Sequence, residues 1–351
     1  LNAIESEAEL TFIGRLMSRN DIVQWLKNRL LVERFREINP RVVDQEIINP
    51  TFVIGLPRSG TSILYELLAL DPEVNVPLIW EAFIPCPFGG SESLNAQNRR
   101  SRAHTAFSLW QEIVPDFGSI HKMSADIPAE CGLLMANTFI SDHIASLHQT
   151  PSYSKYCSTA DLVPVYKYHK LLLQILQSQK PDGRWLLKAP EHQVHLEALM
   201  EVYPDANIIQ THRDPIVCMA STASLLQALY LVRSSKTFDT LQFENIVLGQ
   251  ATAERLTHVM DQRESKKIGK EHIFDSRYQD LLSDPVRCIK RIYDYFGRDL
   301  PSDMQTSILD YVKEKPQYRD GEHRYSIGKP LIKDRKLFSR YQKEYDVPDE
   351  I

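Results

Sequence analysis

The sequence predicts an α/β fold in which a parallel sheet is flanked by helices. Four stretches have the length and apolar composition of buried strands: 51–54, 184–188, 207–211 and 272–276. Helical patterns separate these stretches, and such alternation is typical of a parallel sheet with helices on both faces. A chain of 351 residues with 43% hydrophobic residues can build the core that this fold requires.

The predicted helices precede the sheet and fill the gaps between its strands. Residues 1–48 form a helical N-terminal extension, in which Asp21 is a candidate N-cap. Residues 72–120 are rich in Pro and Gly, which predicts a long loop ending in a helix. The other expected helices are 61–70, 94–112, 129–147, 163–177, 195–202, 215–231, 243–264 and 285–296. We expect these elements to form a single domain over residues 1–351.

Composition excludes several classes of function. The net charge of −5 argues against general nucleic-acid binding, so any basic site must be local. No apolar run reaches the ~18 residues that a membrane span requires. The five cysteines are scattered without a C-x-x-C pair, which is typical of reduced thiols in a cytoplasmic compartment. No metal-ligand cluster is visible in the sequence.

The segment Thr51–Ser62 carries the clearest chemical signal. A strand leads into a loop of four residues bracketed by Gly55 and Gly60, and a helix follows directly. Backbone N–H groups and a helix N-terminus then face one spot, which suits an anion. The NTPase P-loop requires Lys where this chain has Thr61, whereas Arg58 lies inside the loop. We therefore expect a bound phosphate or sulfate without ATP or GTP hydrolysis.

A second anion site is predicted at the end of the strand 207–211. Arg213 follows that strand, and Ser221 comes eight residues later, about two helical turns along. The Arg guanidinium is a planar fork suited to phosphate, and the Ser hydroxyl can reach the same group. An ordinary ion pair between Arg213 and Asp214 is the alternative. Two anion sites in one crevice suit a nucleotide with phosphates at both ends of its ribose.

Three segments together resemble a known family. They are Phe52–Thr61, Trp185–His192, and Thr211–Pro215 with Ser221 eight residues after Arg213. The combination resembles sulfotransferases that use 3′-phosphoadenosine 5′-phosphosulfate (PAPS), in their bacterial-type branch, over roughly residues 50–300. The resemblance implies a P-loop-type sheet and metal-independent transfer of a sulfuryl group to a hydroxyl, or less readily an amine. PAPS would be the co-substrate and adenosine 3′,5′-bisphosphate the product.

The resemblance also implies which residues bind the nucleotide. The loop would hold the 5′-phosphosulfate, with Arg58 where many relatives have Lys, and Arg213 with Ser221 would hold the 3′-phosphate. Tyr278 would lie near the adenine or the 3′-phosphate, and residues 316–351 would close over the nucleotide, unless they are a solvated basic tail. The implied set is Arg58, Ser59, Gly60, Thr61, Ser62, Arg213, Ser221, Tyr278, Arg324, Gly328 and Lys329.

Sulfuryl transfer needs a base and cations that neutralise the developing charge. Lys188 and His192 follow the second strand, and the family places a catalytic His in the loop after this strand. His192 is our first candidate for the base, because an unperturbed His titrates near neutrality. Glu81 is its rival, because some branches of the family use a Glu from this region. The candidate catalytic set is His192, Arg58, Lys188 and Glu81.

The acceptor side is assigned to residues 72–180, with a contribution from the helix around 222–240. The candidate acceptor residues are Trp80, Glu81, Phe83, His121 and Glu130. Further apolar residues either line this pocket or belong to the core: Phe107, Trp110, Leu225, Leu226, Leu229 and Tyr230. A mostly apolar pocket predicts a small apolar acceptor, such as a lipid, phenol or sterol alcohol.

Two other classes of function compete with this hypothesis. A P-loop small-molecule kinase using ATP and Mg²⁺ would need the missing lysine and a strand-end Asp. Asp214 is at such a position, but it precedes Pro215 and has the pattern of a loop cap. A nucleotide-binding module without catalysis would have no need of Lys188 and His192. Metal dependence separates the first alternative from a sulfotransferase, and turnover separates the second.

Overall fold

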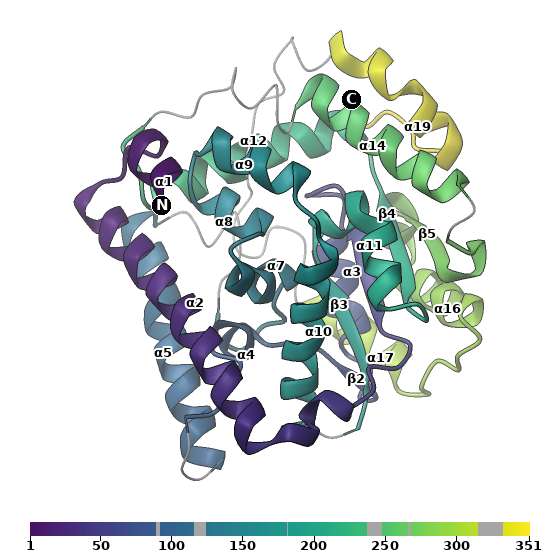
Figure 1. The fold of residues 1–351 in the computed structure, drawn as a ribbon. Coiled ribbons are helices and arrows are strands. Elements are labelled where there is room, and N and C mark those ends of the chain that lie inside the picture. The colour runs from purple at the N-terminus through teal and green to yellow at the C-terminus, as the bar shows by residue number, and fades with distance from the viewer. Residues whose placement is uncertain (89–91, 116–123, 181, 237–247, 266–267, 315–332) are drawn as a thin grey trace. The chain divides into compact units, whose positions relative to one another are not determined.

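The structure is a computed structural model of residues 1–351 (Figure 1). It describes the chain except residues 89–91, 116–123, 181, 237–247, 266–267 and 315–332. The chain divides into two compact units, and each is described by itself. Unit 1 comprises residues 1–47, 77–182 and 225–239, and unit 2 comprises residues 48–76, 183–224 and 240–351. The organisation of the whole chain as one domain stays a prediction.

Unit 2 is built on a five-stranded sheet in the order β2-β3-β1-β4-β5. All neighbouring strands pair in parallel, which confirms the predicted α/β fold. The strands are β1 (Thr51–Gly55), β2 (Val74–Asn75), β3 (Arg184–Lys188), β4 (Asn207–His212) and β5 (Ile273–Arg277). Strand β2 was not predicted, because two residues carry too little pattern. Since β1 is central, the loop that follows it lies between the ends of β3 and β4.

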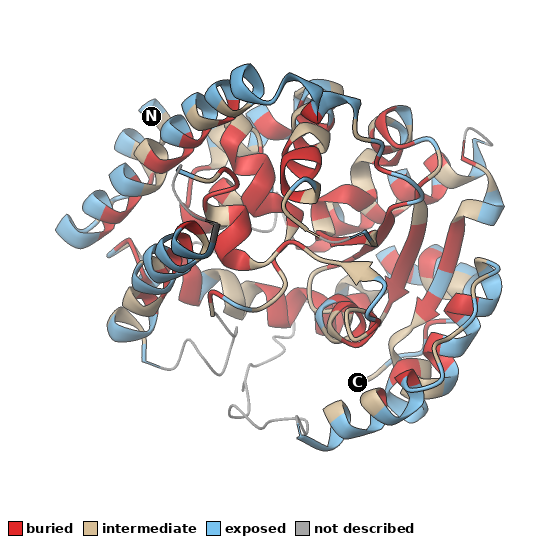
Figure 2. Cartoon of the chain, turned by 90° about the horizontal axis from the view of Figure 1, so that it is seen from below, coloured by how far each residue is buried: buried red, intermediate tan, exposed pale blue. Residues whose placement is uncertain are grey.

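Helices cover both faces of the sheet, whose strands are mostly buried (Figure 2). On one face, apolar side chains of four helices pack on Val53, Ile209 and Phe274 from the strands. On the other face, the ring of Phe52 contacts those of His192 and Tyr203. The four helices on the first of these faces are α3 (Thr61–Leu68), α15 (Tyr278–Ser283), α16 (Pro285–Tyr295) and α17 (Met304–Glu314). The other helices of unit 2 are η3 (Pro190–His195), α11 (Leu196–Val202), α14 (Gly249–Glu264), η4 (Lys270–His272), η5 (Asp334–Phe338) and α19 (Ser339–Tyr345).

A polar network fixes α19 to the end of β4. His212 is buried, with its ring nitrogens 2.9 Å from the Tyr341 hydroxyl and 2.7 Å from the Asp275 carboxylate. Tyr345 stacks on the His212 ring at 4.1 Å, and Arg263 donates to both oxygens of Asp275. Burial alone would raise the pKa of Asp275, but hydrogen bonds from Arg263 and His212 hold it well below its usual value. The C-terminal segment is therefore held beside the strand end that carries Arg213.

Unit 1 is helical, and two of its boundaries differ from the prediction. Helix α2 begins at Phe12, where the Thr11 hydroxyl accepts the Gly14 N–H, so Asp21 is not an N-cap. Asp21 instead accepts a hydrogen bond from the buried Arg233 at 2.8 Å. The predicted helix 129–147 is interrupted, because Phe139 has a left-handed φ of 60°. A separate helix begins after Ser141, whose hydroxyl accepts a hydrogen bond from the His143 N–H.

The helix predicted at 163–177 is confirmed, whereas the helices at 79–83 and 151–159 were not predicted. The described helices of unit 1 are α1 (Asn2–Glu7), α2 (Phe12–Ile38), η1 (Pro40–Asp44), α4 (Ile79–Phe83), α5 (Glu92–Ile113), α7 (Cys131–Met135), η2 (Ala136–Thr138), α8 (Asp142–Leu147), α9 (Pro151–Thr159) and α10 (Val163–Gln177). Helix α12 (Pro215–Leu231) starts in unit 2 and ends in unit 1. None of the helices that the structure describes has the length and apolarity to cross a bilayer. All five cysteines are free thiols and buried.

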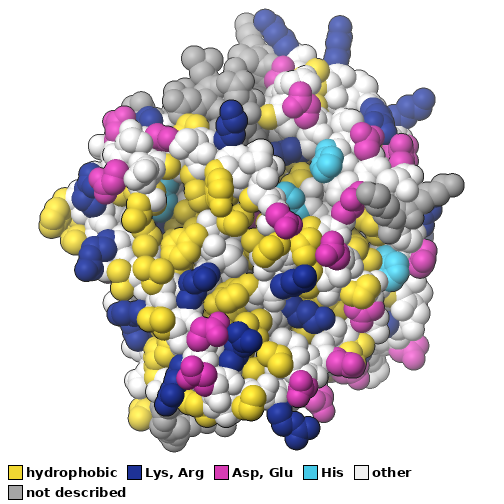
Figure 3. Space-filling view, in the orientation of Figure 1, with side chains coloured by type: hydrophobic (Ala, Val, Ile, Leu, Met, Phe, Trp, Pro, Cys, Tyr) yellow, Lys and Arg dark blue, Asp and Glu magenta, His cyan; other side chains and the backbone are white. Residues whose placement is uncertain are grey.

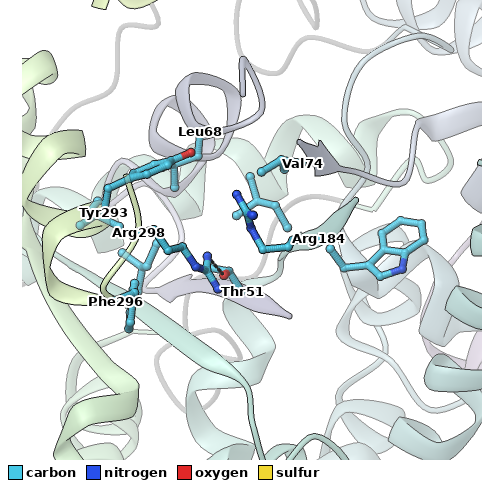
Figure 4. Close-up of a pocket in the computed structure, with 11 residues that line it drawn as sticks. Thr51, Leu68, Val74, Arg184, Tyr293, Phe296 and Arg298 are labelled. Atoms are coloured by element: carbon cyan, nitrogen blue, oxygen red, sulfur yellow. Dashed lines mark hydrogen bonds between the residues drawn. The ribbon is translucent and has the colours of Figure 1, made fainter. Parts of the chain in front are cut away.

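A small cavity lies where the strands of unit 2 begin, lined by Thr51, Arg184 and Arg298 among others (Figure 4). Arg298 donates to the Thr51 hydroxyl at 3.1 Å. The cavity volume is about 20 Å³, which accommodates a water molecule and not a nucleotide. Trp185 also lines it and is buried, whereas the other three tryptophans, Trp25, Trp80 and Trp110, belong to unit 1. Ligands of parallel sheets bind at the opposite edge, beyond the carboxyl ends of the strands.

Candidate nucleotide-binding and catalytic site

The loop between β1 and α3 has the backbone of an anion cradle. Arg58 and Gly60 adopt left-handed φ values of 69° and 95°, and Gly60 is the N-cap of α3. The N–H groups of the first turn of a helix have no acceptor within their own helix. At Gly55, with φ of 142°, a Cβ atom would lie 2.3 Å from the Thr211 hydroxyl oxygen, so only glycine fits. The loop therefore has the left-handed backbone turns of such a cradle, and binding of an anion there stays a prediction.

Ser59 holds the loop to the neighbouring strand. Its hydroxyl is buried, donates to the Leu56 carbonyl at 2.6 Å, and lies 2.6 Å from the Thr211 hydroxyl. Its backbone N–H also donates to the Leu56 carbonyl, at 3.1 Å. A direct contact between the Ser59 side chain and an anion is thus not supported by this geometry. These contacts of Ser59 hold the loop in its conformation, and the N–H groups of Gly60, Thr61 and Ser62 stay the predicted ligands of an anion.

Arg58 connects the two predicted anion sites. Its Nε donates to the Ser221 hydroxyl on α12 at 3.0 Å. Its carbonyl oxygen accepts a hydrogen bond from the Arg213 Nη1 at 3.1 Å. The sequence placed Arg58 at the 5′ end of a nucleotide and Arg213 with Ser221 at the 3′ end. The structure brings all three residues together.

Tyr278 packs between the cradle and Arg213. The Arg213 guanidinium lies over the Tyr278 ring, 4.1 Å from its centroid, as a cation–π contact. A Cβ atom at Gly60 would lie 2.5 Å from the edge of the same ring. Tyr278 is the first residue of α15, directly after β5. The carboxyl ends of β1, β4 and β5 therefore contribute neighbouring groups.

The Arg213 guanidinium holds a carboxylate. Its Nε lies 2.9 Å from Oε1 of Glu350, and its Nη2 lies 2.8 Å from Oε2. Burial alone would lower the pKa of Arg213, but the hydrogen bonds to Glu350 raise it above its ordinary value. Glu350 was not predicted, because a single acidic residue within the segment 316–351 carries no pattern of its own. An anion therefore sits where the resemblance places a 3′-phosphate.

Lys188 supplies a cation beside the first turn of α3. It is the last residue of β3, is only 4% exposed, and its Nζ donates to the Ser62 hydroxyl at 3.3 Å. Its Nζ also lies 5.9 Å from the centre of the Tyr65 ring. The position that holds Lys in an NTPase P-loop is Thr61 here. Lys188, at the end of the neighbouring strand β3, thus supplies a positive charge in place of the P-loop lysine.

Both candidate bases are buried, His192 in unit 2 and Glu81, at 6% exposed, in unit 1. His192 is 0% exposed, and its ring meets Phe52 edge-on at 5.2 Å inside the layer between sheet and helices. A base must touch the acceptor hydroxyl, and His192 as that base stays a prediction. Glu81 lies in unit 1, where its Oε2 accepts hydrogen bonds from the Leu78 N–H and the Lys180 ammonium, both at 2.8 Å. The other carboxylate oxygen of Glu81, Oε1, takes part in neither of these two contacts.

The remaining predicted residues either pack in unit 1 or lie outside the part of the chain that the structure describes. Trp80 is buried, and the Arg99 guanidinium lies 4.7 Å from the centre of its ring. The ring of Phe83 packs edge-on against that of Phe107, with 5.5 Å between the ring centres. Glu130 is half-buried at the start of α7. Among the further apolar candidates, Leu225 and Leu226 are half-buried, and the buried ones are Phe107, Trp110, Leu229 and Tyr230. Four predicted residues lie outside the described residues: His121, Arg324, Gly328 and Lys329.

A comparison with protein families decides the assignment. The model of the sulfotransferase family matches residues 50–302, which include the cradle, Lys188, Arg213 and Tyr278. The chain belongs to the sulfotransferase family. The match begins one residue before β1 and extends past β5, so it spans the whole sheet.

Individual relatives of this sulfotransferase come from mycobacteria. Omega-hydroxy-beta-dihydromenaquinone-9 sulfotransferase Stf3 of Mycobacterium bovis is 24% identical over 323 residues, covering 88% of this chain and 79% of that protein. The crystal structure of sulfotransferase STF9 from Mycobacterium avium superposes with a TM-score of 0.84 at 27% identity, covering 99% of this chain and 90% of that one. For sulfotransferase STF1 from Mycobacterium tuberculosis H37Rv, the TM-score is 0.76 at 28% identity, covering 97% and 89%.

Proposed function

We propose that this sulfotransferase moves the sulfuryl group of PAPS to a hydroxyl, or less readily an amine, of a small and largely apolar acceptor. The observation that carries the proposal is the Arg213 guanidinium, which binds a carboxylate as a fork directly beside the cradle. A phosphate offers the same kind of oxygen pair to a guanidinium. Two anion-binding groups side by side match a nucleotide with a 5′-phosphosulfate and a 3′-phosphate.

The residues of unit 2 fit such a nucleotide. Arg213 and Ser221 would bind the 3′-phosphate, and the N–H groups of Gly60–Ser62 would bind the 5′ end. PAPS supplies an activated sulfuryl group whose leaving group is a phosphate. Lys188 would neutralise the negative charge that builds up on this phosphate, and burial strengthens that effect. These cations make a metal unnecessary in this proposal.

The acceptor is proposed to be a hydroxylated lipid. Support comes from the aromatic side chains Trp80, Phe83 and Phe107, which gather on α4 and α5 in unit 1. Further support comes from Stf3, because its name specifies a hydroxylated menaquinone, an apolar isoprenoid quinone. An apolar pocket with one base would select such an alcohol over a charged sugar.

We propose Glu81 ahead of His192 as the base. Glu81→Gln is expected to lower kcat about 10²-fold, because an amide cannot take the acceptor's proton. His192→Asn should instead lower the midpoint of urea unfolding, since His192 packs in the core. The measurement is transfer of ³⁵S from PAPS to a hydroxylated isoprenoid quinone. If His192→Asn abolishes transfer while Glu81→Gln retains it, the two roles must be exchanged.

The function as a whole is tested by titrating the protein with adenosine 3′,5′-bisphosphate in EDTA and again in Mg²⁺. We expect binding of equal strength in both, because Arg213, Lys188 and the cradle bind the phosphates without a metal. The kinase alternative is not favoured, since the Asp214 carboxylate already accepts from Arg335 and from the Ile216 N–H. Binding of ATP that needs Mg²⁺, without binding of the bisphosphate, would contradict the proposal.

A further inference from the structure

We infer that Glu350 competes with the 3′-phosphate of the nucleotide for Arg213, so that the nucleotide binds by displacing a carboxylate of the chain itself. This inference rests on the proposed function, because it takes Arg213 as the 3′-phosphate site. It goes beyond that function by assigning a role to a residue outside the family match, which ends at residue 302.

The contact between the two side chains is a true fork. Both carboxylate oxygens of Glu350 take part, at 2.9 Å from Nε and 2.8 Å from Nη2 of Arg213. This is the geometry by which a guanidinium grips a phosphate, so carboxylate and phosphate cannot use these two N–H groups at once. The side chains of Arg213 and Glu350 are 18% and 21% exposed, so solvent screens the pair only in part.

The segment around Glu350 is anchored by groups other than its own carboxylate. The Glu350 N–H donates to the Asp214 carboxylate at 2.9 Å. Arg335 donates to the same carboxylate at 3.2 Å and to the Ile351 carbonyl at 3.1 Å. Tyr341 ties the preceding helix to His212. The backbone can therefore stay in place while the Glu350 side chain rotates away from Arg213.

An anchored competitor has consequences for both ends of the catalytic cycle. Because Glu350 is tethered beside Arg213, its effective concentration there is high, and it re-enters as soon as the phosphate leaves. A nucleotide with a 3′-phosphate must overcome this contact, whereas AMP, which lacks that phosphate, need not disturb it. The carboxylate thus weakens binding of PAPS and of the bisphosphate product alike, since both carry the 3′-phosphate, and it favours release of the product.

The test is calorimetric titration of wild type, Glu350→Gln and Glu344→Gln with adenosine 3′,5′-bisphosphate and with AMP. Glu350→Gln should bind the bisphosphate roughly fivefold more tightly, the size expected for a partly screened charge-assisted pair. Its affinity for AMP should equal that of wild type. Glu344→Gln makes the same charge change on the exposed face of α19 and should behave as wild type with both ligands. Glu350→Asp, whose side chain is shorter, should fall between wild type and Glu350→Gln.

Each other outcome overturns the inference. Weaker binding of the bisphosphate by Glu350→Gln would show that Glu350 supports Arg213 as a phosphate ligand. Unchanged binding would show that the phosphate does not use the same N–H groups. In an Arg213→Ala background, Glu350→Gln should have no effect, and a persisting gain would also refute the mechanism. Wild type that binds no bisphosphate removes the proposed function as well, so the two failures are distinguishable.

Discussion

Replacing Arg213 by alanine is expected to weaken the binding of adenosine 3′,5′-bisphosphate about a hundredfold, or ~2.7 kcal/mol at 25 °C. Arg213 offers the 3′-phosphate two N–H groups in one plane, which alanine cannot replace. The loss is moderated because Glu350 occupies those groups in the wild type. Arg213→Lys should be intermediate, since lysine keeps the charge and loses the fork. The measurement is the dissociation constant by calorimetry.

Two comparisons make the result specific to the 3′-phosphate. Affinity for AMP should be nearly the same in Arg213→Ala and wild type. Arg340→Ala removes an exposed arginine that also contacts two carboxylates, Asp261 and Glu264, and should leave both affinities unchanged. If Arg213→Ala binds the bisphosphate as wild type does, the 3′-phosphate site is elsewhere and the proposed nucleotide orientation is wrong.

Replacing Lys188 by methionine is expected to lower kcat by about 10²–10³-fold, a loss typical for one group that stabilises charge in a transition state. Methionine is unbranched and has similar length, so packing beside Tyr65 is preserved while the charge is lost. Affinity for adenosine 3′,5′-bisphosphate should fall much less than the rate, because the cradle and Arg213 still bind its phosphates. Single-turnover transfer from ³⁵S-labelled PAPS measures the effect.

The control for Lys188→Met is the same substitution at Lys290. Lys290 is exposed on α16, where its ammonium contacts Asp294 at 3.3 Å, and its loss should not change the rate. Equal losses in rate and in bisphosphate affinity for Lys188→Met would assign Lys188 to ground-state binding. An unchanged rate would remove Lys188 from the catalytic set.

The sequence was most informative where local chemistry alone decides the structure. The cradle was predictable because Gly55 and Gly60 adopt backbone angles that few other residues tolerate. Strand β3 and helix α10 have the bounds predicted for them, since apolar residues fill the middle of β3 and recur at helical spacing along α10. The clustering of Arg213, Ser221 and Arg58 could be expected, because the carboxyl ends of parallel strands meet at the same edge of the sheet.

The misses have both local and long-range causes. The start of α2 was predicted too late because its first turn exposes Phe12 and Ile13, which a pattern of buried apolar residues does not anticipate. Hydrophobic side chains reach the surface where α2 runs in the view of Figure 3. Glu350 meets Arg213 across 137 residues of sequence, and a lone acidic residue in a polar segment gives no signal. The burial of His192 depends on how Phe52 packs, which no local motif encodes.

The placement of the tryptophans gives unit 2 an optical reporter of its own. Because Trp185 is the tryptophan of unit 2, its fluorescence would follow that unit once Trp25, Trp80 and Trp110 were replaced by phenylalanine. Its indole emission should shift to longer wavelength as the buried ring becomes exposed to water. Comparing that signal with far-ultraviolet circular dichroism of the whole chain would show whether the two units unfold together or one after the other.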